Sequence, residues 1–510
     1  MLYSLDIWNR FCEKVESEKD DEGSFLLKNY HHFDPPFNFP EKKYQLHKLV
    51  SDVELMSKHA FLPLVKVLSK TPRYRYQEEL KKYDLETKIR PISFASHFDN
   101  YIYGYYSYAL NEKYQEYLKE AGFSESILAY RTDLDGKCNI QFANEVFDTI
   151  RKMGNCTAIA LDIKSYFDNI EHNTLKEKWC KVLKSDQLPR DQFNIYKSLT
   201  KYSYINKRTV LTHFGINLRQ KRKNGEKWRT LLDLVPDELS GRKFVDKFNY
   251  FRERDLIAIN RPKEPGGKVD RGIPQGLAIS SVLSNIYLID FDETLFRMGD
   301  EKGFTYRRYC DDLVIICPSE MANELIRFIC SDIKDKYGLT IQRKKTEVLE
   351  FKANKIGKIR SFKTLYDEKA DEFISLPPEE RNYKNLQYLG FEFNGHNIYV
   401  RPSSLSRYYR KMKGRVFKSV AMAYSKKASF PQILKKSIYK KYSHIGSRNF
   451  ISYVYSASRK YYFNSKGERK EGMNSPHIRK QLSAHMNLIK AEIEKTGNQR
   501  AVMKSVKIKK

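Results

Sequence analysis

The pattern of apolar and polar positions divides the middle of the chain into two kinds of segment. Short apolar runs at 157–163, 305–309, 313–317 and 386–393 have the length and composition of strands. Longer stretches at 140–153, 280–296 and 321–338 have the spacing of amphipathic helices. Because the two kinds alternate from about residue 76 onward, the pattern predicts an α+β core that extends to about residue 395.

The two flanks of this core have a different pattern. Residues 1–75 read as mainly helical, with an apolar helix expected around Val53 to Leu68. After residue 395, the spacing of Val416, Val420 and Ala423 again indicates helices. The sequence therefore predicts three parts: a helical region at 1–75, the α+β core at 76–395 and a helical domain at 396–510.

Charge changes the interpretation of the last part. The 510 residues carry a net charge of +30, and residues 401–510 hold 28 Lys and Arg but four Asp and Glu, so +24 lies there. Tyrosines are interleaved with these cations, a mixture that suits phosphates and bases. The alternative is a helical domain with a solvated basic face and a tyrosine-filled core. The candidate nucleic-acid-binding residues are Arg407, Arg410, Lys411, Lys435, Lys436, Lys440 and Lys441.

Other composition features exclude several classes of protein. No run of about 18 apolar residues is present, and the acid-rich N-terminus does not have the pattern of a signal peptide. The seven cysteines are scattered without a C-x-x-C pair, which argues against a disulfide scaffold or a zinc site. We therefore expect a cytoplasmic protein with no membrane partner.

Three carboxylates occur where strands end. Asp162 closes the apolar run at 157–162, and Asp311 and Asp312 form the turn between two strand-like runs. If these strands are neighbours, the carboxylates meet at one edge and can bridge two divalent metals roughly 3.5–4 Å apart. Oxygen ligands favour Mg²⁺, with Mn²⁺ as an alternative ion. The alternative is that each Asp only caps a strand end or a turn.

Five sequence elements around these carboxylates resemble the palm motifs of reverse transcriptases, in the same order. They are Asp162 with Phe167, Gly272-Ile-Pro-Gln-Gly276, Tyr309-Cys-Asp-Asp312, Gly338 to Lys345, and Leu386-Gln-Tyr-Leu-Gly390. Residues 88–92 and 128–136 resemble fingers motifs of the bacterial branch. The wording of the palm is most similar to defence-associated and abortive-infection reverse transcriptases, with the class 9 defence type as the expected subclass. The resemblance implies a right-hand polymerase fold of fingers, palm and a basic, mainly helical thumb.

The resemblance also implies roles for the carboxylates and the residues beside them. Asp162 and Asp311 would bind the metals together with the Ile163 carbonyl, and Asp312 would support them as a further catalytic and metal-binding carboxylate. Phe167 would lie under the sugar of the incoming nucleotide and select dNTPs, with a core aromatic as the alternative interpretation.

Four more residues would contact the nucleotide. Gln275 would reach nucleotide or template from its glycine-flanked loop, and Arg90 would hold the triphosphate with Lys88 as a second candidate. Lys345 matches the lysine that protonates the departing pyrophosphate, although Lys344 leaves an ambiguity of one residue.

The function that the resemblance implies is an RNA-directed DNA polymerase in bacterial antiphage defence. Its partners would be a noncoding RNA template, dNTPs and the DNA product, and the protein would form a homo-oligomer. Some relatives synthesise DNA without a conventional template or start on a protein hydroxyl, and the sequence does not single out a priming tyrosine. The alternatives are an inactive nucleic-acid-binding protein and a retron or group II intron type of enzyme.

Overall fold

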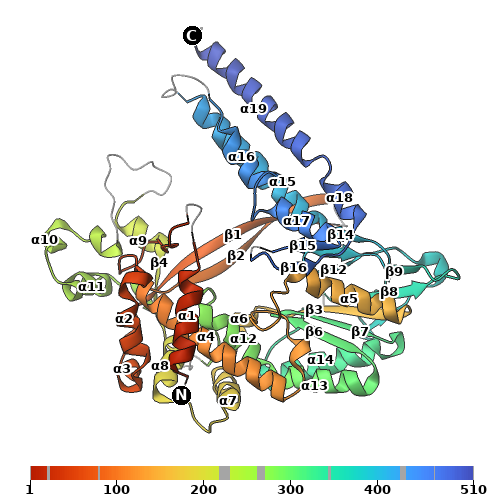
Figure 1. The fold of residues 1–510 in the computed structure, drawn as a ribbon, viewed down its shortest axis with the longest axis horizontal. Coiled ribbons are helices and arrows are strands. Elements are labelled where there is room, and N and C mark those ends of the chain that lie inside the picture. Colours follow the sequence, from red (N-terminus) through yellow and green to blue (C-terminus); the bar gives the residue numbers. More distant parts are fainter. Residues whose placement is uncertain are drawn as a thin grey trace.

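The computed structural model describes residues 2–19, 23–77, 81–216, 230–260, 270–342, 346–425, 432–464 and 466–508. No helix among them is long and apolar enough to cross a membrane. Figure 1 shows a broad body of helices and sheets from which two long C-terminal helices project.

A five-stranded antiparallel sheet forms the centre of the palm, in the order β6-β7-β3-β8-β9. Alternate residues of its strands face two different cores, as the two-residue period of a strand requires. Ile159 and Ile315 pack into the larger core, whereas Ala158 and Ile316 pack into the second one. The strands are β3 (Cys156–Asp162), β6 (Thr305–Tyr309), β7 (Asp312–Cys317), β8 (Glu347–Ala353) and β9 (Ile359–Lys363).

Helices cover both faces of this sheet. The larger core contains buried residues of α4 (His97–Glu120), α7 (His172–Leu183), α12 (Ala278–Tyr287), α13 (Ile289–Lys302) and α14 (Ala322–Tyr337). The second core contains residues of α5 (Asn139–Met153), α17 (Phe450–Ser458) and α18 (Pro476–Leu482). The thumb and the palm therefore share one core.

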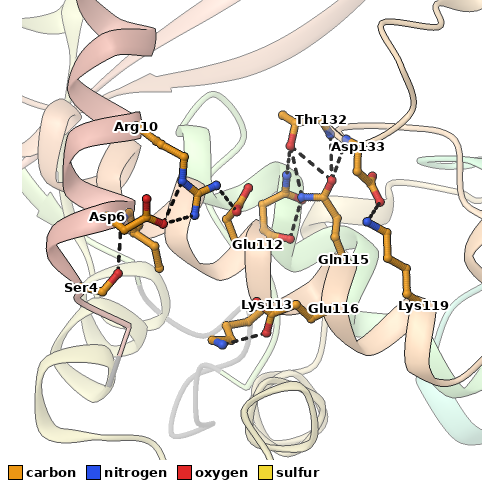
Figure 2. Close-up of polar contacts among 12 residues, drawn as sticks. Ser4, Asp6, Arg10, Glu112, Lys113, Gln115, Glu116, Lys119, Thr132 and Asp133 are labelled. Atoms are coloured by element: carbon orange, nitrogen blue, oxygen red, sulfur yellow. Dashed lines mark hydrogen bonds and ion pairs between the residues drawn. The ribbon is translucent and has the colours of Figure 1, made fainter.

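The N-terminal region packs on α4 rather than standing apart. It comprises α1 (Leu5–Glu16), α2 (Phe39–Val50) and α3 (Val53–Ser57). Figure 2 shows Arg10 of α1 between Asp6, at 2.8 Å, and Glu112 of α4, at 2.6 Å. The predicted helix over 53–68 is wrong in its second half: α3 ends at Ser57, and Leu64 begins a strand.

A second sheet forms the fingers, in the order β2-β1-β4-β5. Its strands are β1 (Leu64–Gln77), β2 (Lys82–Phe94), β4 (Ser203–Asn206) and β5 (Ile257–Ile259). The expected boundary at residue 75 is wrong because β1 continues through it, paired with β2 from Val65 to Gln77. α8 (Arg190–Thr200) precedes β4. The segment between β4 and β5 contains α9 (Lys207–His213), α10 (Asp237–Ser240) and α11 (Phe244–Glu253). A third core, which includes Phe33 and Phe251, joins this segment to the rest of the protein.

The C-terminal part begins with small sheets and continues as helices. β12 (Leu386–Tyr388), β13 (Phe391–Phe393) and β14 (Ile398–Val400) form one sheet, while β10 (Leu365–Asp367) pairs with β11 (Glu372–Ile374) and β15 (Tyr461–Phe463) with β16 (Arg469–Glu471). α15 (Pro402–Ala423) and α19 (His485–Ile508) run side by side, with α16 (Lys435–Tyr442) beside α15 (Figure 1). Met412, Val416, Val420, Ile438 and Ile489 form the core between them.

Candidate active site

The three candidate carboxylates lie at one edge of the palm sheet. β3 and β7 pair in antiparallel register, which places Asp162 directly opposite Asp312. The backbone N–H of Ile163 donates to the carbonyl of Asp311 at 3.2 Å, and the N–H of Gln342 donates to the carbonyl of Asp162 at 3.0 Å. The pairing of two strands far apart in sequence therefore brings all three carboxylates to the same strand ends.

The turn that carries Asp311 has an unusual backbone. Cys310 adopts a left-handed conformation with φ of 60°, which for a residue with a side chain costs about 1–2 kcal/mol. Below it, the buried Arg308 guanidinium donates to the Cys310 carbonyl at 3.1 Å. The same guanidinium forms an ion pair of 2.5 Å with Asp292 of α13, and both side chains are fully buried. A buried ion pair thus supports the turn from inside the palm.

The charges around Asp312 show how closely the carboxylates are placed. Its side chain is exposed at the start of β7 but has protein on most sides, and this desolvation raises its pKa to about 7, together with the charges of Asp311 and Asp162. The positive charges of Arg401 and Lys88 act in the opposite direction. Lys88 comes from the fingers and Arg401 from the start of α15, so fingers, palm and thumb meet at this point.

The donor set fits magnesium in its chemistry. Asp162, Asp311 and Asp312 supply hard carboxylate oxygens, and their mutual repulsion is what a bound cation would relieve. Among the described residues, however, no three Asp, Glu, His or Cys side chains are grouped closely enough to hold a metal ion. The structure therefore shows suitable ligands at one sheet edge but not a formed coordination site.

The Gly272–Gly276 loop docks beside the carboxylates. The N–H of Gly272 donates to the Ile170 carbonyl at 2.8 Å, and the N–H of Ile273 donates to the Phe167 carbonyl at 3.0 Å. At the other end, the N–H of Ser93 in β2 donates to the Gln275 carbonyl at 2.8 Å. Gly276 has φ of 119°, and a Cβ on it would lie 2.5 Å from the Ser93 carbonyl oxygen. Only glycine allows the fingers strand to approach this loop so closely.

This docking creates a pocket that brings predicted residues together. The pocket has a volume of 350 Å³ and is lined by Ile92, Tyr130, Phe167, Gln275 and the start of α12. Phe167 and Gln275, more than 100 positions apart in sequence, thus share one cavity. It can hold one flat, partly apolar group between an aromatic ring and an amide.

Tyr130 is a wall of this pocket that sequence reasoning missed. It has a left-handed φ of 60°, and the residues on either side of it in the loop are fixed by hydrogen bonds. Asn285 donates to the Ala129 carbonyl at 2.8 Å, and the Gln115 side-chain oxygen accepts from the backbone N–H groups of Thr132 and Asp133 (Figure 2). The signal was present in the 128–136 motif, but nothing local indicates which of its side chains faces the pocket.

Arg131, in the same motif, has a structural position. Its side chain is almost fully buried and forms an ion pair of 2.7 Å with Asp133, and it also donates to the Ser124 carbonyl and, at 2.7 Å, to the Ser124 hydroxyl. The guanidinium therefore holds the loop that presents Tyr130.

The predicted phosphate contacts lie on the fingers hairpin. Arg90 and Lys88 are alternate residues of β2, opposite Ser69 and Thr71 of β1, so they occupy the same face of the hairpin. Both side chains are partly exposed. Lys345 and its neighbour Lys344 lie outside the described residues, so this prediction stays untested.

The seven predicted nucleic-acid-binding residues all have exposed side chains on α15 and α16. Nearby tyrosines range from buried to exposed: Tyr408 is buried and donates to the Tyr442 carbonyl at 2.5 Å, Tyr409 and Tyr442 are partly buried, and Tyr461 is exposed. The basic face and the tyrosine-containing core are therefore both present. Arg401, which precedes α15, was not among the predicted residues although its charge acts on Asp312.

Solved structures with some similarity include two fungal telomerases. Apo telomerase from Candida tropicalis, truncated from its C-terminal domain, has a TM-score of 0.36 and 12% identity, covering 70% of this chain and 60% of that one. Telomerase from Candida albicans in complex with a TWJ fragment of telomeric RNA has a TM-score of 0.34 and 12% identity, covering 93% and 68%. Scores this low carry no argument about function.

No curated protein sequence matches the chain. Residues 243–393 match the family described as "Reverse transcriptase (RNA-dependent DNA polymerase)", a range that contains the Gly272–Gly276 loop and the Asp311–Asp312 turn but not Asp162. This match and the α+β palm described above confirm the expected right-hand polymerase fold. The matched residues make up less than half of the chain, and over them the protein is similar to a reverse transcriptase domain.

Proposed function

We propose that this protein is an RNA-directed DNA polymerase that adds dNTPs at the edge of the palm sheet. The observation that carries the proposal is the register of β3 and β7, which places Asp162 opposite Asp312 beside Asp311. The pocket that contains Phe167 and Gln275 and the reverse transcriptase match support the same activity.

In this proposal Asp162, Asp311 and the Ile163 carbonyl hold two Mg²⁺ ions, with Asp312 as a supporting carboxylate. The ions would supply Lewis acidity for a 3′-hydroxyl and neutralise phosphate charge. The chain's own residues then position the reactants. Rigid strand ends fix the carboxylates, which keeps the geometry at the sheet edge constant from one addition to the next.

The residues around the carboxylates would bind and select the nucleotide. Arg90 and Lys88 project from one face of the fingers hairpin and would hold the triphosphate, for which a guanidinium has the better geometry. Phe167 would exclude a 2′-hydroxyl by its bulk, and Gln275 would contact the nucleotide or template by its amide. Lys345 would protonate the pyrophosphate as it departs.

We further propose that the polymerase acts in the bacterial cytoplasm, in antiphage defence, as a homo-oligomer that copies an associated noncoding RNA. The amino-acid sequences of the palm motifs, which resemble those of defence-associated reverse transcriptases, support this assignment. Synthesis without a conventional template, or priming by a tyrosine of the chain that the sequence does not single out, belongs to the same proposal.

The activity is tested by incorporation of labelled dNTPs on a primed RNA template with Mg²⁺. We expect incorporation by the unaltered protein and its loss in the double variant Asp311→Ala/Asp312→Ala, and activity that survives this change would refute the metal assignment. The biological role is tested by sequencing the RNA and DNA that co-purify with the protein. Recovery of one enriched RNA with complementary DNA would support templated synthesis, and DNA covalently attached to a tyrosine would support protein priming.

A further inference from the structure

A second concave surface lies on the fingers sheet, outside the candidate active site. It is an open groove of 820 Å³ between β1 and the segment 206–216, which contains α9. β4 pairs in parallel with β1, with Lys66 opposite Asn206, and this pairing fixes the two walls next to each other. The groove therefore depends on the part of the chain inserted between Asp162 and the Gly272–Gly276 loop.

The walls of this groove carry one sign of charge. Lys66, Lys70, Lys207 and Arg208 line it, and none of the described lining residues is acidic. Burial lowers the pKa of Lys66 and that of Lys207, while the charge of Asp168 acts on Lys66 in the opposite direction. Removing lysine ammonium groups from water costs free energy that an anion in the groove would offset.

The groove also has an apolar lining, which narrows the class of ligand. Val67, Leu68, Leu211 and Ile216 contribute to it, and Leu68 is 45% exposed. Lys66 lies with its ammonium 3.8 Å from the ring centroid of Tyr204. Cations beside apolar and aromatic surface suit a ligand that has both phosphates and bases. Inorganic phosphate would use only the cations.

The spacing of the cations favours a chain of phosphates. Lys66 and Lys70 are four residues apart on one face of β1, which corresponds to roughly 13 Å along the strand. That length exceeds the reach of the phosphates of a single nucleotide and matches several successive phosphates of a strand.

The groove is separate from the predicted triphosphate contacts. Arg90 and Lys88 pair with Ser69 and Thr71, so they share the face of the hairpin on which these residues lie. Lys66 and Lys70 alternate with Ser69 and Thr71 and therefore occupy the opposite face. The groove also includes Val67, which shares the face of Ser69 and Thr71, so it follows the edge of β1 that faces away from β2, beyond the pairing of β1 with β4 at residues 64–66. A ligand in the groove would run along that edge and not along β2, which carries Arg90 and Lys88.

We propose that this groove binds the sugar-phosphate backbone of a single-stranded segment of nucleic acid. The assignment of the ligand as nucleic acid rests on the proposed function, whereas the anionic character of the site rests on the groove itself. The fingers would then hold a strand independently of the basic face of α15 and α16.

The test is photocrosslinking of the full-length protein to a short oligouridine RNA that contains 4-thiouridine, with the adducts mapped by mass spectrometry. We expect adducts on residues 64–77 or 203–216. The four-site variant Lys66→Gln/Lys70→Gln/Lys207→Gln/Arg208→Gln should lose them, and its slope of log affinity against log salt should fall by roughly 3, at 0.7 per phosphate contact on a single strand. The single exposed change Lys70→Glu, checked by circular dichroism, gives the same direction with less risk to folding.

A matched variant removes four exposed lysines elsewhere, at Lys42, Lys48, Lys355 and Lys369, and should leave both the adducts and the salt slope near those of the unaltered protein. The proposal is overturned if adducts map only to other segments, if the slope does not change in the groove variant, or if excess dATP abolishes the groove adducts, which would indicate a site for free nucleotides. Primed dNTP incorporation is measured separately: its absence in the unaltered protein contradicts the proposed function and leaves the binding result intact.

Discussion

The buried ion pair between Arg308 and Asp292 makes the stability of the palm depend on a single carboxylate. Asp292 accepts from Arg308 Nε at 2.7 Å, from Arg308 Nη2 at 2.5 Å and from the Tyr306 hydroxyl at 2.7 Å. Neither charged side chain has solvent access. In Asp292→Ala the guanidinium would remain buried without its charged partner, with the Asn285 and Cys310 oxygens as its remaining acceptors.

Breaking a buried pair from one side costs about 3–5 kcal/mol, and we expect a loss of this size in the free energy of unfolding. The change is measured as a shift of the urea midpoint, followed by tryptophan fluorescence. The urea midpoint of Asp292→Asn should lie between those of the unaltered protein and Asp292→Ala, because the amide keeps one acceptor oxygen but loses the charge. Asp300→Ala, at an exposed position of the same helix, is the control and should stay within about 0.5 kcal/mol.

An Asp292→Ala midpoint that corresponds to a loss of less than about 1 kcal/mol, the range of an exposed ion pair, would contradict a stabilising role of the buried pair. It would mean that Arg308 finds another partner or reaches solvent. The variant should also lower dNTP incorporation at temperatures where it stays folded, because Arg308 supports the Cys310 carbonyl in the turn that carries Asp311.

Three further predictions follow from the geometry. Gly276→Ala should reduce dNTP incorporation at least tenfold in steady-state assays without unfolding the protein, because the new Cβ would displace Ser93 from Gln275; normal activity would show that the contact is not required. His32 is buried, and burial lowers its pKa from 6.5 to about 4. As the pH falls, the unfolded state therefore binds a proton at this histidine before the folded state does. The free energy of unfolding should decrease by about 3 kcal/mol from pH 6.5 to pH 4. His32→Gln should lack this dependence in urea titrations at several pH values, and an equal dependence would exclude His32 as its source. Replacing Lys435, Lys436, Lys440 and Lys441 of the thumb by glutamine should lower the slope of log affinity against log salt for nucleic-acid binding by roughly 3. An unchanged slope would mean that this face binds another partner.

The palm was predictable because its information is local. The run that ends at Asp162 is apolar from Ala158 to Leu161, and the turn at Asp311 and Asp312 lies between two strand-like runs, so the strands followed from the pattern. That the two strands are neighbours is shown by their pairing in the structure. The hairpin of β1 and β2 was not predictable in this way. Its strands contain polar residues such as Lys70 and Thr71 and are defined by their pairing with each other, and a short apolar stretch near Leu64 can be read with either period.

The missed site residues have a similar explanation. Tyr130 faces the pocket because Arg131 turns inward to Asp133 and Ser124, a choice that depends on contacts outside the motif. Arg401 acts on Asp312 because the first turn of α15 begins close to the palm edge, which only the packing of the thumb on the shared core determines. Sequence spacing identifies which residues carry chemistry more readily than it identifies what holds them.

We propose that the carboxylates at the ends of β3 and β7 support metal-dependent DNA synthesis. The most direct measurement is the rate of dNTP incorporation on a primed RNA template as Mg²⁺ is titrated, for the unaltered protein, Asp162→Asn and the exposed control Asp186→Asn. We expect Mg²⁺-dependent incorporation that is abolished by Asp162→Asn and retained by Asp186→Asn. Incorporation by Asp162→Asn at the rate of the unaltered protein would contradict it.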